Sequence, residues 1–216
     1  WRMQTIMSLS IGQGEIGATP LQIANLSATV ANRGHYFIPH IIKDTDGFEI
    51  DPKFKEPKYT KVDTKYFDIA VEGMEMAVNG GGTAGGTAFG AAIPGIRVCG
   101  KTGTAQNPRG DDNSVFICFA PEDNPKIAVV AYLENAGFGA TWAAPIASLM
   151  MEQACNDTIK RKYIVDRIAN ALYNELVHYK KGYKAMPKII EKVREQLIAE
   201  ARRQSSEVGY AQMTMR

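Results

Sequence analysis

The chain has 216 residues, which is long enough for one domain or for one domain with an appendage. Its hydrophobic content of 45% and charged content of 22% are ordinary for a soluble globular protein. The net charge of +2 is unevenly distributed, because residues 158–216 carry 13 Lys and Arg against 6 Asp and Glu, while residues 1–157 carry 12 against 17. Glycine and proline interrupt the two long uncharged runs, 76–96 and 135–151, so neither run is expected to span a membrane.

The cysteines and histidines do not group as metal ligands or as part of a catalytic triad. The three cysteines lack Cys-x-x-Cys spacing and are interpreted as small buried residues (Cys99, Cys118, Cys155), and the three histidines are scattered (His35, His40, His178). A phosphate-binding loop is not expected at the glycine-rich segment 81–88, since no Lys-Ser/Thr pair opening a helix follows it. We expect neither a metal nor a cofactor.

The first elements alternate between helix and extended chain. Gly12-Gln13-Gly14 predicts a loop, and Thr19-Pro20 predicts a helix start with threonine as N-cap, ended near 32–34 with Gly34 at C′. Residues 35–42 alternate as a strand does, and residues 44–61 are predicted to be an irregular excursion.

The middle of the chain predicts a helix followed by three strands. The helix begins at Asp63 or Thr64 and continues to residue 78, with apolar residues at helical spacing. The strands are predicted at 96–104, 114–120 and 126–133, the last two joined by a tight polar turn at 121–125. A helix at 141–154 follows, and the tail predicts two amphipathic helices, at 163–179 and 187–201.

The first predicted strand ends in Lys101-Thr102-Gly103-Thr104. A cation, two hydroxyls and a glycine at the end of an apolar run suit a strand that binds a carboxylate. Lys-Thr-Gly is also one of three signatures of penicillin-recognising serine enzymes, beside Ser-x-x-Lys and Ser-Asp-Asn. No serine in these 216 residues has lysine three positions on, and Ser-x-Asn does not occur.

The surroundings of this motif resemble class B penicillin-binding proteins, in particular the elongation transpeptidases of Bacteroidetes-type bacteria. The resemblance covers about residues 1–155 and rests on the order and spacing of several segments. These are Ser8–Glu15 with Ala18–Gln22, Asn79–Ala84, Pro94-Gly95, Cys99–Gln106, Phe119-Ala120-Pro121, Asn124-Pro125, Leu133–Asn135 and Gly137–Met150.

The resemblance implies a fold and a domain boundary. The fold is α+β, a partial penicillin-recognising serine transpeptidase fold with three of the usual five antiparallel strands and flanking helices. Residues 1–155 would be the C-terminal part of the transpeptidase domain, and residues 156–216 a basic helical tail. The strand at 126–133 would present an open edge, so we expect the chain to self-associate there or the tail to cover it.

The resemblance also implies a function: part of a D,D-transpeptidase that cross-links peptidoglycan stem peptides ending in D-Ala-D-Ala through an acyl-serine, and that binds β-lactams. Lys101 would help to position substrate and developing charge, and Thr102 and Thr104 would hold the carboxylate. The N–H of Thr104 would form half of the oxyanion hole, and Gly103 would leave room for substrate main chain. Without the nucleophile motif, this chain alone is expected to be inactive.

Other interpretations remain open at this point. The chain could be a non-catalytic module that senses β-lactam or stem peptide, or a carboxypeptidase or β-lactamase relative. Family partners would be membrane proteins of the elongation complex, at the periplasmic face of the inner membrane, with an anchor upstream of Trp1. The tail could be a solvated hairpin, a surface for anionic lipid or an artefact of fusion; nucleic acid is not expected.

Several single residues near the motif have modest expected roles. Gln13 and Glu15 are predicted to brace a loop, and Ser114 and Ser148 to be ordinary serines. Residues 107–113 are predicted to form a polar, solvated excursion beside the motif. Phe138 and Trp142 are predicted to pack in the core rather than to line a cleft.

Overall fold

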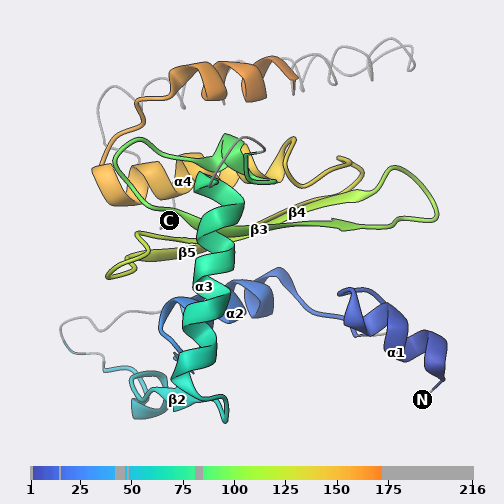
Figure 1. The fold of residues 1–216 in the computed structure, drawn as a ribbon. Coiled ribbons are helices and arrows are strands. Elements are labelled where there is room, and N and C mark those ends of the chain that lie inside the picture. The colour runs from blue at the N-terminus through green and yellow to red at the C-terminus, as the bar shows by residue number, and fades with distance from the viewer. Residues whose placement is uncertain (1, 15, 42–46, 48, 81–84, 172–216) are drawn as a thin grey trace. The chain divides into compact units, whose positions relative to one another are not determined.

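The computed structural model describes residues 2–14, 16–41, 47, 49–80 and 85–171 (Figure 1). Within these ranges no helix is both long and apolar enough to cross a bilayer. The chain divides into two compact units, residues 1–148 and 149–216, and the division falls inside helix α4 (Ala143–Asn156). The boundary at 155/156 stays a prediction.

A three-stranded antiparallel sheet organises the first unit. It consists of β3 (Cys99–Ala105), β4 (Asn113–Ala120) and β5 (Ile127–Leu133), in the order β3-β4-β5. All three strands were expected, with β3 beginning three residues later than predicted. The predicted turn between β4 and β5 is confirmed, and it is closed by a hydrogen bond from Lys126 N to Ala120 O.

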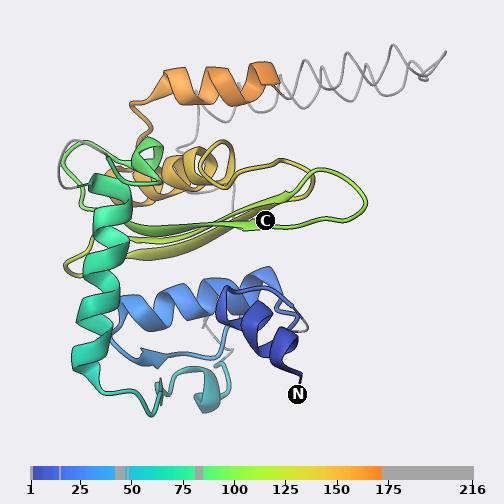
Figure 2. The same cartoon turned by 45° about the vertical axis from the view of Figure 1, so that its right-hand side comes forward.

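Helix α2 (Pro20–Ala31) lies along one face of this sheet (Figures 1 and 2). Its start is the predicted N-cap, strengthened by a capping box in which Thr19 and Gln22 each accept from the other's main chain. Its end differs from the prediction, because the residue with positive φ at C′ is Arg33 and Gly34 follows it. The N–H of Gly34 reaches back to Thr29 O and completes a Schellman motif.

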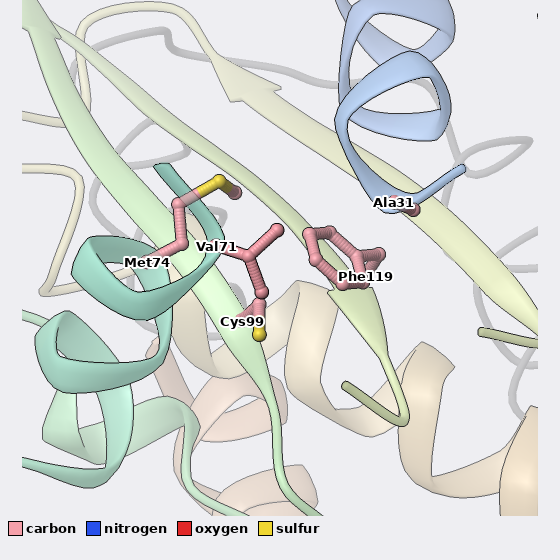
Figure 3. Packing of buried hydrophobic residues seen from close by; sticks show 5 residues of the cluster. All are labelled: Ala31, Val71, Met74, Cys99 and Phe119. Atoms are coloured by element: carbon pink, nitrogen blue, oxygen red, sulfur yellow. The ribbon is translucent and has the colours of Figure 1, made fainter. Parts of the chain in front are cut away.

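Helix α3 (Thr64–Asn79) begins at the predicted N-cap Asp63, whose carboxylate accepts from Lys65 N. It runs across the direction of α2 near the beginning of β3 (Figure 2). Its buried stripe has helical spacing and consists of Phe67, Val71, Met74 and Val78. This stripe meets α2 and the sheet in a core cluster of Ala31, Val71, Met74, Cys99 and Phe119, drawn in Figure 3.

The opposite face of the sheet carries the buried side chains of Phe116 and Cys118. Ser114 lies on this face too, because alternate residues of a strand point the same way. Its Oγ accepts from Ala143 N at 3.3 Å and donates to Phe138 O at 3.1 Å. Ser114 therefore joins β4 to the loop and to the first residue of α4, which makes its role structural.

Two predictions for the first 60 residues were wrong. The strand at 35–42 is only β1 (His35–Tyr36), which pairs with β2 (Lys58–Tyr59) inside the segment predicted to be irregular. Pro39 helps to end the extended run, because proline cannot donate to a strand ladder. Helix α1 (Met3–Ser10) was not predicted, although Met3, Ile6 and Met7 have helical spacing; it is only eight residues long and buries no residue. Short 3-10 helices lie at Pro52–Phe54 and Phe89–Ala91.

The second unit contains a buried ion pair. Arg161 Nε lies 3.0 Å from Glu152 Oε2, and the two side chains are 8% and 2% exposed. The other oxygen of Glu152 accepts from Lys160 N at 3.1 Å. These contacts tie α4 to the start of the next helix, which covers residues 162–171. The remainder of the two predicted tail helices lies outside the described residues.

Candidate active site

The Lys-Thr-Gly-Thr motif occupies the middle of β3, which is an edge strand of the sheet. One edge of β3 pairs with β4 throughout, from Cys99 opposite Phe119 to Ala105 opposite Asn113. Among the described strands, none pairs with its other edge. The motif therefore lies on a strand with one edge open to a ligand.

The strand divides the side chains of the motif between its two faces. Lys101 and Gly103 share the face of Cys99, which packs in the core with α2 and α3. Thr102 and Thr104 share the other face, where they lie opposite Phe116 and Ser114. The two hydroxyls are thus neighbours on one face, and the lysine side chain leaves from the opposite face.

Two side chains donate hydrogen bonds to main-chain oxygens of the motif. Lys101 Nζ donates to Thr102 O at 2.6 Å, and Gln13 Nε2 donates to Thr104 O at 3.5 Å. Neither donor belongs to β4, so both carbonyls are accessible from outside the ladder. In an antiparallel strand, the N–H and the C=O of one residue point to the same side. The N–H groups of Thr102 and Thr104 are therefore expected at the open edge, beside their carbonyls.

The contact from Gln13 was not foreseen. The side chain was predicted to brace a loop, yet it lies half-buried against a strand 91 residues away. The available signal was a polar residue between two glycines, and both Gly12 and Gly14 adopt positive φ, 79° and 100°. Glu15 lies outside the described residues.

The two glycines of β3 differ in whether the fold requires them. A Cβ on Gly100 would lie 2.3 Å from Cζ of Phe116, a fully buried ring, so the fold itself requires glycine there. A Cβ on Gly103 would come no closer than 3.4 Å, to Val115 Cβ, which is an ordinary contact. The fold of this chain therefore does not require glycine at 103.

A loop borders the face that carries the two threonines. A Cβ on Gly139 would lie 2.3 Å from Val115 O and 2.6 Å from Gly103 O, so this loop runs against the main chain of the sheet. Phe138, beside it, is 73% exposed, so the prediction that it packs in the core was wrong. Trp142 is half-buried.

The loop between β3 and β4 is held by side chains. Asn107 Nδ2 donates to Asn135 Oδ1 at 2.8 Å, and Asn107 N donates to Asp112 Oδ1 at 3.3 Å. Asn113 Oδ1 accepts from Asn135 N at 3.0 Å. The excursion predicted at 107–113 therefore has an internal polar network that connects it to the chain after β5.

The thiols near the motif do not supply a nucleophile. Burial, with smaller contributions from the charges of Glu122 and Glu75, raises the pKa of Cys99 to about 12. Burial also raises the pKa of Cys118. Both thiols stay protonated at neutral pH, and a thiol is a poor nucleophile compared with a thiolate.

An antiparallel sheet with flanking helices, and a Lys-Thr-Gly-Thr strand with an open edge, define a domain of the penicillin-recognising type. The family model described as penicillin binding protein transpeptidase domain matches residues 1–152. The chain belongs to this family.

Comparison with an individual protein agrees with this family assignment. The peptidoglycan D,D-transpeptidase MrdA of Haemophilus influenzae is 34% identical over 177 residues, which are 74% of this chain and 27% of that protein. The chain thus spans about a quarter of the length of this relative.

Solved structures show the same fold. Pseudomonas aeruginosa PBP2 in complex with WCK 5153 superposes with a TM-score of 0.60 at 35% identity, covering 76% of this chain and 36% of that one. The imipenem acyl-enzyme complex of penicillin-binding protein A from Mycobacterium tuberculosis gives 0.55 at 31% identity, covering 68% and 33%. The predicted fold class is therefore confirmed.

Proposed function

We propose that this chain is the C-terminal part of a peptidoglycan D,D-transpeptidase, whose nucleophilic serine lies upstream of it in a longer protein. The observation that carries the proposal is the Lys101–Thr104 motif on the open edge of β3, in a chain that belongs to the transpeptidase family. Cross-linking would proceed through an acyl-serine, formed from D-Ala-D-Ala and resolved by the amine of a second stem peptide.

Thr102 and Thr104 bind the terminal carboxylate of the stem peptide, or the equivalent carboxylate of a β-lactam. Their position on one face supports this role, because two hydroxyls on neighbouring positions of one face can donate to the same anion. Lys101 is exposed and its ammonium lies at Thr102 O, where it helps to position the substrate and the charge that develops.

The N–H of Thr104 supplies one donor of the oxyanion hole, and the N–H of the upstream serine supplies the other. Loss of one such donor lowers kcat by about 10²–10³. Gly103 admits the main chain of the substrate beside the strand. The fold itself would accept a Cβ at this position, so packing does not explain the glycine. The lack of a packing reason supports a role for Gly103 in binding the substrate.

The ligands are peptidoglycan stem peptides and β-lactams, and the acyl-enzyme structure of the mycobacterial relative supports the second. The partners are membrane proteins of the elongation complex, a proposal that rests on the family resemblance. The protein acts at the periplasmic face of the inner membrane, anchored by an upstream segment, in a bacterium of the Bacteroidetes type.

The chain alone also self-associates through β5, or residues 156–216 cover that edge, because among the described strands β5 pairs only with β4. Size-exclusion chromatography of the chain without residues 156–216 tests this. A monodisperse monomer would contradict it.

Intact mass after incubation with benzylpenicillin tests the function. The longer protein, whose upstream sequence should contain Ser-x-x-Lys and Ser-x-Asn, is expected to form a stoichiometric, hydroxylamine-labile adduct, and the 216-residue chain is expected to form none. An adduct on the chain alone would place a nucleophile within it and overturn the proposal. Reversible binding without an adduct in the longer protein would favour a non-catalytic sensor.

A further inference from the structure

We propose that Gln13 is a positioning residue for acyl transfer, holding Thr104 so that its N–H faces the carbonyl oxygen of the acyl donor. The inference rests on the proposed function. Its basis is the hydrogen bond from Gln13 Nε2 to Thr104 O, which joins two segments 91 residues apart. The residue that Gln13 contacts is the one whose main chain would carry the oxyanion donor.

The main chain of Gln13 is itself fixed by the end of α1. Gly12 N donates to Leu9 O at 3.0 Å, and Gln13 N donates to Ser8 O at 3.0 Å, the two bonds of a Schellman motif. Gly12 has φ of 79°, as this motif requires of its C′ residue. Gln13 therefore projects from a closed turn and not from a freely moving loop.

Gly14 closes the turn on its other side. It has φ of 100°, and a Cβ added to it would lie 3.1 Å from Ser8 Cβ. Two glycines with positive φ thus surround Gln13 and set the direction in which its side chain leaves. This arrangement suits a side chain that must reach one defined acceptor.

The contact constrains the part of β3 that would meet the oxyanion. In a strand, the C=O and N–H of one residue point to the same side, so a donor that holds Thr104 O also limits rotation of Thr104 N–H. Lys101 Nζ donates to the carbonyl oxygen of Thr102, which is the preceding carbonyl that points away from β4. The two side chains together fix the open edge over the length of the motif.

Acylation kinetics of the longer protein with benzylpenicillin provide the first test. Gln13→Leu keeps the side-chain size and removes the donor, and Gln4→Leu makes the same change at an exposed site on α1. For Gln13→Leu, the acylation rate constant is expected to fall roughly 3- to 10-fold, the range for one neutral hydrogen bond, while the reversible affinity changes less than about 2-fold. Gln4→Leu is expected to match the wild type.

The carbonyl ¹³C chemical shift of Thr104 provides a second readout that does not depend on activity. Loss of the donor is expected to move this resonance upfield in Gln13→Leu and not in Gln4→Leu. An unchanged acylation rate constant in Gln13→Leu overturns the positioning role, whether or not the resonance moves. If the wild type is not acylated at all, the proposed function fails, and an unchanged resonance then also refutes the contact.

Discussion

Alanine substitutions at the two glycines of β3 should have opposite consequences. Gly100→Ala places a methyl group 2.3 Å from Cζ of Phe116, whose ring is fully buried. Gly103→Ala places the same group 3.4 Å from Val115 Cβ. The two variants lie three residues apart in one strand, so each is a matched control for the other.

The magnitudes follow from these distances. Ordinary contact begins near 3.4 Å, so the ring of Phe116 would have to withdraw by about 1.1 Å from a packed core. Overpacking of this kind costs about 1–3 kcal/mol, while replacing glycine by alanine in a strand recovers about 0.5–1 kcal/mol. Gly100→Ala should therefore lower the free energy of unfolding by up to about 2.5 kcal/mol. Gly103→Ala should leave it unchanged or raise it by up to about 1 kcal/mol.

Urea denaturation followed by circular dichroism measures both effects, and benzylpenicillin acylation of the longer protein measures function. Gly103→Ala should retain stability and lose acylation, because its methyl group would project from the face that carries Lys101, beside the edge where substrate main chain would pair. Gly100→Ala should lose stability and keep acylation under conditions where it is folded. A Gly103→Ala protein that is acylated normally, or one less stable than Gly100→Ala, would refute this reasoning.

Three further predictions concern helix α3, the second unit and a thiol. Gly73→Ala should raise the free energy of unfolding by about 1 kcal/mol in urea denaturation, because the glycine lies in an exposed helix interior with open space around it; a loss would contradict this. Glu152→Gln should destabilise the second unit by about 3 kcal/mol, since Arg161 loses a buried charge partner; amide exchange at 160–171 that stays as slow as in the wild type would refute this. Cys99 should lower stability at alkaline pH, because its thiol ionises from about pH 9 in the unfolded chain and only near pH 12 in the folded one. Cys99→Ala should remove that part of the decline between pH 9 and 12, and an identical pH profile would show that Cys99 does not contribute.

Local sequence patterns predicted the elements that bury one face. The apolar stripe of α3, the N-caps Thr19 and Asp63 and the three strands of the sheet were all found within a few residues of their predicted positions. These signals depend on side-chain periodicity and on hydrogen bonds to residues two or three positions away. They can therefore be read without knowledge of the fold.

Elements that depend on distant partners were not predicted. Strand β1 pairs His35 with Tyr59, and its short length depends on that partner and on nearby Pro39. Helix α1 was missed for another reason: Met3, Ile6 and Met7 have helical spacing, but the helix is only eight residues long. The exposed position of Phe138 likewise follows from the path of a loop, which its apolar character cannot reveal.

The family and the motif of the candidate site could be recognised without the fold, because the residues of Lys101–Thr104 are contiguous in the chain. How that motif is presented to a ligand depends on the folded chain. Strand pairing assigned Thr102 and Thr104 to one face and Lys101 to the other, and folding brought Gln13 to Thr104. Such arrangements depend on which strand edge is left unpaired and on contacts across 91 residues, and local sequence encodes neither.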